Sequence, residues 1–253
     1  RIFYEGRDIS RLGERQFRSY RKDMQIVFQN PNTALDPKRS VRNLIAEPLM
    51  IHGIVPRREL DGEIIRLLNM VGLSRAAMTK MPREFSGGEK QRICVARALA
   101  VRPRFLFLDE PVSSLDVSVQ SKILNLLEEL KQALDLTYLF VAHGLNVVRH
   151  ISDRVAVMYL GQIQEIGDTE DLYEDPRHPY TQALVSSFPE PELDARRERI
   201  VLSGEIPSNT DAIRGCAFHT RCPYAGDICR RVAPDLTMRD GRMVRCHGRG
   251  GGV

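Results

Sequence analysis

The stretch FLFLDEP (residues 105–111) places two carboxylates and a proline directly after four apolar residues. A continuous apolar run of this kind is typical of a parallel strand that is buried on both faces. The two acids then lie at the carboxyl end of the strand, where open α/β sheets bind their ligands. Asp109 is suited to hold magnesium, and Glu110 is placed to orient or deprotonate an attacking water. The alternative is a solvated strand end.

Three further polar residues favour a ligand site at these acids. Gln29 follows the apolar run 24–28, and His143 follows the apolar run 137–142. Asp116 ends the sequence SSLD (residues 113–116), shortly after the acids. Polar groups that repeatedly follow apolar runs indicate that several strand ends carry functional side chains.

A second phosphate-handling element precedes the acids, in FSGGEKQR (residues 85–92). Its Ser-Gly-Gly turn opens a helical run, so free backbone N–H groups and the positive helix end face outward together. Gly87 and Gly88 let the main chain approach a phosphate, and Ser86 can cap the helix while donating its hydroxyl. Taken alone, this pattern also fits an ordinary capped helix.

The other elements indicate a mainly parallel α/β core with a helical insertion. Apolar residues recur at helical spacing from Val41 to Val101, which predicts a helical subdomain about 41–101. Asp116 is a plausible N-cap for a helix over 117–134 with Ile123, Leu127, Leu130 and Leu134 on one buried face. The expected strands are 1–4, 24–28, 137–142, 155–160 and 162–166, with 24–28 as a central strand. The last two strands join at Gly161 as a tight hairpin, and the strands from 137 onward complete the sheet.

Taken together, the motifs resemble those of the nucleotide-binding subunit of an ABC transporter. Residues 86–91 resemble the signature motif, 105–110 the Walker B strand with its catalytic glutamate, and 114–116 the D-loop. His143 resembles the switch histidine and Gln29 the Q-loop glutamine. The stretches ISDRVAVMYLG (151–161) and HPY (178–180) are similar to those of oligopeptide and dipeptide permease ATPases, with nickel importers as close relatives. The resemblance covers residues 1–247.

This resemblance implies a fold, a domain division and a set of site residues. The fold is α/β, with a P-loop NTPase-like ABC ATPase core over 1–167 that is incomplete at its N-terminus and a small cysteine-containing module over 168–253. ATP and Mg²⁺ are the implied cofactors. The implied catalytic residues are Glu110 and His143; the nucleotide-binding residues are Gln29, Ser86, Gly87, Gly88, Glu89, Asp109 and Asp116; and Asp109 and Gln29 are the magnesium residues.

The resemblance also implies partners and a location. ATP would lie between one subunit's Walker A loop and the signature helix of a second ATPase subunit, in a head-to-tail homodimer or heterodimer. The assembly would energise integral-membrane permease subunits on the cytoplasmic face of the inner membrane, with an extracytoplasmic peptide-binding protein as an indirect partner. We expect no nucleic-acid partner, because the net charge of +4 is not gathered in a basic cluster with interleaved aromatics.

The chain departs from the family pattern in three places. The chain holds no G-x-x-x-x-G-K-[ST] loop, so we expect that it begins after the Walker A loop and its helix and hydrolyses negligible ATP by itself. Glu89 stands where the signature usually has glutamine, and Gly144 replaces the acid that commonly follows the switch histidine. Two other functional classes remain open, namely a soluble ABC protein that acts on ribosomes or DNA, and a non-catalytic interaction or sensor subunit.

Four cysteines cluster near the C-terminus with the spacing C-x5-C-x6-C-x16-C. A cytosolic chain does not favour structural disulfides, so clustered thiols indicate a metal site. The thiols could hold a 4Fe–4S cluster, which we favour, or zinc, although the spacing lacks the paired C-x2-C of common zinc ribbons. Unligated thiols are the third alternative. The four residues are Cys216, Cys222, Cys229 and Cys246.

Overall fold

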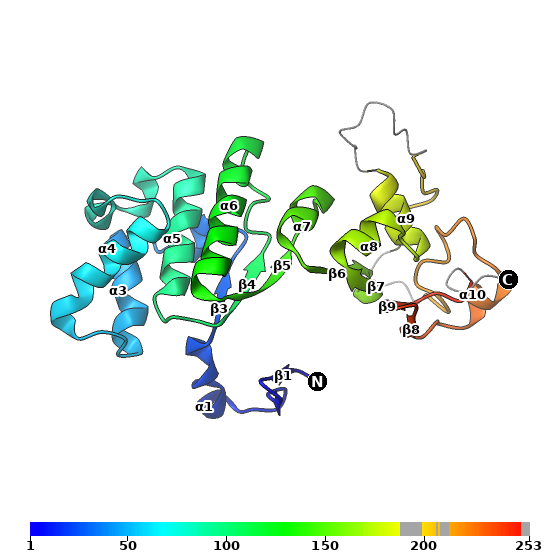
Figure 1. Cartoon of the computed structure of the whole chain (residues 1–253), viewed down its shortest axis with the longest axis horizontal. Helices are drawn as coiled ribbons and strands as arrows, with labels where there is room; N and C mark the ends of the chain where they lie inside the picture. The colour runs from blue at the N-terminus through cyan, green and yellow to red at the C-terminus, as the bar shows by residue number, and fades with distance from the viewer. Residues whose placement is uncertain (188–198, 206, 208–212, 249–253) are drawn as a thin grey trace. The chain divides into compact units, whose positions relative to one another are not determined.

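The computed structural model describes residues 1–187, 199–205, 207 and 213–248. The chain forms two compact units, residues 1–143 and 144–253 (Figure 1). The compact units divide earlier than the domain boundary predicted after residue 167, because the strands that span 154–168 pair with a strand near the C-terminus. Within the described residues, no helix is long and apolar enough to span a bilayer.

The first unit is built on a three-stranded parallel sheet. Its strands are β3 (Met24–Val27), β4 (Phe105–Asp109) and β5 (Thr137–Val141), in the order β3-β4-β5 (Figure 1). All three run in the same direction, with Val27 opposite Leu108 and Leu108 opposite Phe140. The prediction that residues 24–28 form a central strand is wrong for this sheet, because β4 holds the central position and β3 lies at an edge.

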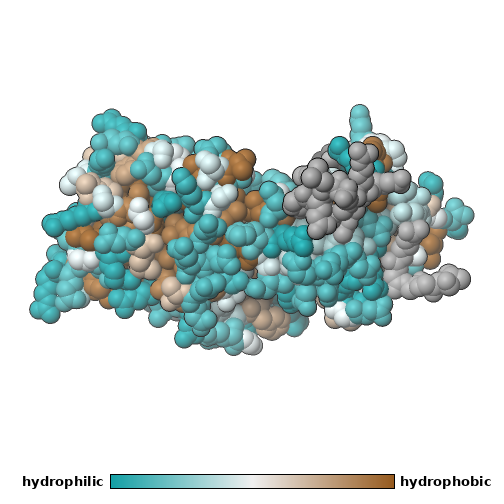
Figure 2. All heavy atoms as spheres, turned by 45° about the horizontal axis from the view of Figure 1, so that its top comes forward, coloured by the Kyte–Doolittle hydropathy of each residue, from teal (hydrophilic) through white to brown (hydrophobic). Residues whose placement is uncertain are grey.

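The two faces of this sheet differ in burial. Leu106 and Leu108 of β4 are fully buried, whereas Phe105 and Phe107 on its other face are only partly buried. Register places Leu139 of β5 beside Phe107, and Leu139 is 51% exposed. The prediction that β4 is buried on both faces is therefore wrong, since alternate side chains point to opposite faces and only one face is fully covered in the described residues. Figure 2 shows hydrophobic residues (brown) at the surface among hydrophilic ones (teal).

Along the chain, the segment between β3 and β4 is helical, as predicted for residues 41–101. It contains α3 (Val41–Ile51), α4 (Leu60–Met70) and α5 (Gly87–Leu99), joined through short 3₁₀ turns at 57–59, 75–79 and 82–84. The three helices contact one another, and each contributes a fully buried apolar side chain: Ile45, Leu67 and Ile93. Short elements complete the early part of the unit: β1 (Phe3–Tyr4), β2 (Arg7–Asp8), α1 (Glu14–Phe17), a 3₁₀ turn (Tyr20–Lys22) and α2 (Pro31–Ala34).

The long helix α6 (Val117–Leu134) has the bounds that the sequence predicts. The Asp116 carboxylate accepts a hydrogen bond from the Val119 N–H at 3.0 Å, which satisfies one of the free donors at the helix start. Ile123, Leu127 and Leu130 are buried as expected. Leu134 is 39% exposed, because it occupies the last position of the helix.

The second unit contains a four-stranded antiparallel sheet of its own. Strands β6 (Arg154–Tyr159) and β7 (Gln162–Asp168) form the predicted hairpin, and β9 (Arg242–Val244) and β8 (Thr237–Arg239) extend it in the order β6-β7-β9-β8. The prediction that this hairpin completes the parallel sheet is wrong. The two-residue turn at Leu160 and Gly161, both with positive φ, joins antiparallel neighbours, whereas a parallel pair requires a long crossover. The helices of this unit are α7 (Leu145–Ile151), α8 (Thr169–Glu174), α9 (Pro179–Ser186) and α10 (Asp227–Arg231).

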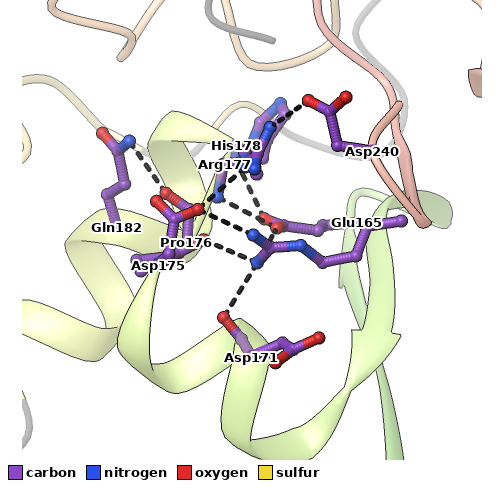
Figure 3. Close-up of polar contacts among 9 residues, drawn as sticks. Glu165, Asp171, Asp175, Pro176, Arg177, His178, Gln182 and Asp240 are labelled. Atoms are coloured by element: carbon purple, nitrogen blue, oxygen red, sulfur yellow. Dashed lines mark hydrogen bonds and ion pairs between the residues drawn. The ribbon is translucent and has the colours of Figure 1, made fainter. Parts of the chain in front are cut away.

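A buried polar network joins this sheet to the loop before α9 (Figure 3). Glu165 of β7 is 0% exposed, and its carboxylate accepts hydrogen bonds from the backbone N–H groups of Arg177 (2.9 Å) and His178 (2.8 Å). Arg242 of β9 donates to the Asp175 carboxylate at 2.8 Å and to two backbone carbonyls. Each buried charge thus has partners, which burial of ionised groups requires.

One glycine makes room for this network. An ideal Cβ at Gly167 would lie 2.8 Å from Cδ of Arg242. Any larger residue at this position would push the Arg242 side chain away from its partners.

We predict that Leu106→Ala destabilises the first unit by about 3 kcal/mol, because it removes a fully buried side chain and leaves a cavity. Leu139→Ala on the neighbouring strand is the matched control, and we expect it to cost less than about 1 kcal/mol because half of that side chain is already exposed. Denaturant unfolding followed by circular dichroism measures both changes. Equal losses for the two variants would contradict the assigned burial.

Candidate functional site

Three of the predicted site residues meet at the carboxyl end of the parallel sheet. Gln29, Glu110 and His143 follow β3, β4 and β5 respectively. Gln29 Nε2 donates to Glu110 Oε2 at 2.8 Å, and His143 Nε2 lies 2.6 Å from Glu110 Oε1. Both oxygens of the Glu110 carboxylate therefore have a partner from a neighbouring strand end.

The surroundings of this cluster are asymmetric. The Glu110 side chain is 14% exposed, whereas that of His143 is 84% exposed. Gln29, the other partner of Glu110, is also exposed, so the mostly buried carboxylate lies next to two solvent-accessible side chains. This arrangement suits a group that acts on a water or phosphate at the sheet edge.

The backbone of Glu110 has an uncommon conformation. Its φ is +45°, in the left-handed region that residues with a Cβ rarely adopt. Its N–H donates to the Val141 carbonyl at 3.0 Å, which continues the pairing of β4 with β5. Such conformations persist where the surrounding structure over-determines them, and they cluster at active sites.

Asp109 is the last residue of β4 and is partly buried beside Glu110. Carboxylate and amide oxygens are the donors that Mg²⁺ prefers, so Asp109 and Gln29 have suitable chemistry for it. In the described part of the chain, however, no group of three or more His, Cys, Asp or Glu residues is arranged to hold a metal ion. Magnesium here would need additional oxygens, such as those of phosphates and water, which is its usual mode in phosphoryl-transfer sites.

The predicted phosphate-binding helix start is present as a capping box. Ser86 is the exposed N-cap of α5, and its N–H and hydroxyl donate to Glu89 Oε2 at 2.9 and 2.8 Å. These two hydrogen bonds, with the backbone bond the stronger cause, hold the pKa of Glu89 below its usual value. Glu89 therefore carries a negative charge beside the helix tip and competes for the Ser86 hydroxyl.

The two glycines at the start of α5 have different surroundings. Gly87 is exposed, so the backbone there is open to a ligand. Gly88 is buried, and an ideal Cβ on it would lie 2.5 Å from Cγ1 of Val119 in α6. The absence of a side chain at Gly88 therefore serves the close packing of α5 against α6, a role that the sequence did not indicate.

The Asp116 side chain is exposed, and its carboxylate forms hydrogen bonds with the first turn of α6, the helix that it caps. Its carboxylate accepts hydrogen bonds from the Ser118 hydroxyl at 2.7 Å and the Val119 N–H. The Ser118 hydroxyl is the larger cause that lowers the pKa of Asp116. The residue is thus an N-cap in this structure, and a role in contact with a second subunit stays a prediction.

Sequence reasoning missed two sets of contacts around the site. The Lys90 ammonium donates to Asn32 Oδ1 at 2.9 Å, which links α5 to α2, the short helix that follows Gln29. Ser113 contacts both Gln29 and the backbone of Glu110. Ser113 lies within the quoted SSLD stretch, but only the three-dimensional turn shows which of its two serines faces the acids.

The four clustered cysteines line one cavity of about 150 Å³ in the second unit. His178, His219 and His247 also contribute to its wall. All five cysteines of the chain are free thiols, and burial raises the pKa of Cys216 and Cys222. Gly215 is needed at its position, since its φ is +77° and an ideal Cβ would lie 2.3 Å from the Cys229 carbonyl oxygen.

Cys94 stands apart from this cluster. It is buried in α5, where desolvation raises its pKa to about 11. Such a thiol is an inert core side chain at neutral pH.

The convergence of four thiols fits a soft metal in donor chemistry. Their arrangement in the described residues does not have the geometry of a formed metal site.

Two family profiles match the chain. The profile described as ABC transporter matches residues 1–113, and the one described as Oligopeptide/dipeptide transporter, C-terminal region, matches residues 164–229. Their order along the chain is that of an ATPase core followed by the C-terminal module.

Curated relatives match over nearly the whole chain. The oligopeptide transport ATP-binding protein AppF of Bacillus subtilis is 48% identical over 250 residues, which cover 97% of this chain and 76% of that protein. The di/tripeptide transport ATP-binding protein DppF of Pseudomonas aeruginosa is 43% identical over 242 residues, which cover 96% and 75%.

Solved structures of ATP-binding cassettes share the fold. CbiO1 of Clostridium perfringens, part of the ABC transporter complex CbiONQ, has a TM-score of 0.63 and 26% identity and covers 69% of this chain and 68% of its own. The dimeric cassette MJ0796, bound to ADP and Pi in a post-hydrolysis state, has a TM-score of 0.58 and 26% identity, with 66% and 72% covered.

The buried His178 predicts a pH dependence of stability for the second unit. Desolvation lowers its pKa from 6.5 to about 4, so between these values the unfolded chain binds more protons than the folded one. Stability is then lost as pH falls below about 6.5, by up to about 3 kcal/mol. Thermal melts at several pH values measure this loss.

His178→Asn is the test variant, because asparagine keeps a cap acceptor for the Tyr180 N–H but does not titrate in this range. We expect its melting temperature to depend less on pH between about 6.5 and 4. An unchanged dependence in this variant would show that His178 is not the group responsible.

Proposed function

The chain belongs to the family of oligopeptide transport ATP-binding subunits of ABC transporters, and from this membership we propose that Glu110, held between Gln29 and His143, is its catalytic base for ATP hydrolysis. Members of this family couple ATP hydrolysis to transport. The observation that supports the assignment is the contact of both Glu110 carboxylate oxygens with side chains from the two adjacent strand ends.

The proposed chemistry assigns a separate role to each of these side chains. Glu110 orients the attacking water and accepts its proton, which requires a carboxylate at the strand end rather than in solvent. His143, the exposed member, exchanges its contact with Glu110 for a hydrogen bond to the γ-phosphate when nucleotide binds. Asp109 and Gln29 would hold Mg²⁺, which neutralises phosphate charge when it is bound.

The signature helix serves a second nucleotide site in this proposal. Exposed Ser86 and Gly87 at the start of α5 present backbone donors and a positive helix end to the phosphates held by a second ATPase subunit. Glu89 takes part in this site through Ser86, and Asp116 contacts the partner across the dimer. The dimer is head-to-tail and energises integral-membrane permease subunits.

Peptides are the proposed cargo, and the cytoplasmic face of the cell membrane is the proposed location. The relatives are named for oligopeptide and di/tripeptide transport, which favours peptides over the nickel alternative. An extracytoplasmic binding protein would deliver the cargo to the permease subunits. Neither a role on ribosomes or DNA nor a purely non-catalytic role has a comparable observation in its favour.

The cysteine cavity is proposed to hold a 4Fe–4S cluster, with zinc as the alternative. All four thiols line the same cavity, and four thiolates satisfy either group. When bound, such a group cross-links loop-rich chain and stabilises its fold. This proposal is independent of the ATPase assignment.

We predict that Glu110→Gln abolishes ATP hydrolysis in the full-length subunit assembled with its transporter partners, with at least about a hundredfold loss of kcat, because an amide cannot accept the proton. Phosphate release in proteoliposomes measures this. Glu170→Gln is the control, since it removes an exposed carboxylate that pairs with Arg149 in the second unit. Hydrolysis that persists in Glu110→Gln would refute the assignment.

For the cavity, we expect the anaerobically purified full-length subunit to contain iron and acid-labile sulfide and to absorb visible light. Metal analysis of wild type, Cys222→Ser and Cys94→Ala separates the alternatives. Loss of metal in Cys222→Ser but not in Cys94→Ala supports the site, and zinc without sulfide selects the alternative group. Protein that holds neither metal would leave the thiols unligated.

A further inference from the structure

Ser113 forms an unassigned link inside the proposed catalytic cluster. Its hydroxyl donates to the backbone carbonyl of Glu110 at 3.1 Å, and its N–H donates to the same carbonyl at 3.3 Å. Gln29 Nε2 lies 3.4 Å from the Ser113 hydroxyl oxygen. The same Gln29 nitrogen donates to the Glu110 carboxylate.

The numbers of hydrogens and lone pairs on the Gln29 amide and the Ser113 hydroxyl determine how these contacts are arranged. A glutamine amide nitrogen carries two hydrogens, so Gln29 can serve the Glu110 carboxylate and the Ser113 oxygen together. A serine hydroxyl carries one hydrogen and two lone pairs, so it can accept from Gln29 and donate to Glu110. The result is a closed ring in which Ser113 joins the Gln29 side chain to the Glu110 main chain.

This ring of hydrogen bonds includes Glu110, whose backbone conformation is uncommon. Glu110 has a φ of +45°, and its carbonyl is the group that Ser113 holds. Without the hydroxyl, the carbonyl would lose one of its two donors, and the Gln29 amide would lose one of its two acceptors. Both changes permit the Glu110 carboxylate to leave its place at the strand end.

The geometry points to Ser113 as a positioning residue that fixes the Glu110 carboxylate through Gln29 and through the Glu110 backbone. This inference rests on the proposed function of Glu110. It assigns Ser113 no contact with the nucleotide, so the effect of Ser113 falls on turnover rather than on nucleotide binding.

The test compares three variants in the full-length subunit within its assembled transporter. Ser113→Ala should lower kcat for ATP about tenfold, with KM and the melting temperature unchanged, because a misplaced catalytic group slows the chemical step. Ser113→Thr keeps the hydroxyl, and its extra methyl has room because Ser113 is exposed; this variant should restore at least half of the wild-type kcat.

Ser121→Ala is the matched control. The Ser121 hydroxyl donates to the Val117 carbonyl at 3.1 Å, the same distance and bond type, on an exposed part of α6 away from the cluster. It should leave kcat within about twofold of wild type, the scatter expected for a neutral change.

Two results would overturn the inference. One is a Ser113→Ala kcat equal to that of Ser121→Ala. The other is a loss in Ser113→Ala that Thr does not restore and that lowers the melting temperature, which would indicate only structural damage. Wild-type protein without turnover, or turnover that survives Glu110→Gln, would instead refute the proposed function.

Discussion

The in-register parallel pairing of β3, β4 and β5 is the constraint on which the site depends. Because the three strands run in one direction, their carboxyl ends lie at one edge of the sheet. Gln29, Glu110 and His143 are 81 and 33 residues apart along the chain, and this pairing alone brings them within hydrogen-bond distance. A shift of one strand by a single residue would turn its polar end group to the other face.

Local signals predicted the parts of the fold that depend on few residues. The bounds of α6, its Asp116 cap and the Ser86 cap of α5 depend on residues only a few positions apart, so the sequence predicts them directly. The return contact of Glu89 to Ser86, which makes this cap a capping box, was not predicted. The same holds for the hairpin at Gly161. The grouping of Gln29, Glu110 and His143 was predicted from strand ends and from the family resemblance together.

What the sequence did not predict depends on distant partners. The pairing of β7 with β9 joins residues 165 and 244, and this pairing moves the hairpin into a separate antiparallel sheet. The Glu165 and Arg242 network is equally non-local, and no periodicity marks a buried glutamate that receives backbone N–H groups. The packing role of Gly88 and the contacts of Ser113 were missed for the same reason, since Val119 of α6 is the neighbour of Gly88 and Gln29 is a partner of Ser113.

The account is tested most directly by a structure of the full-length Glu110→Gln subunit with ATP and Mg²⁺. It predicts the γ-phosphate at the carboxyl edge of β3, β4 and β5, with a water between the phosphate and residue 110 and with His143 on the phosphate. A γ-phosphate bound away from this edge, with residue 110 still held only by Gln29 and His143, would contradict it.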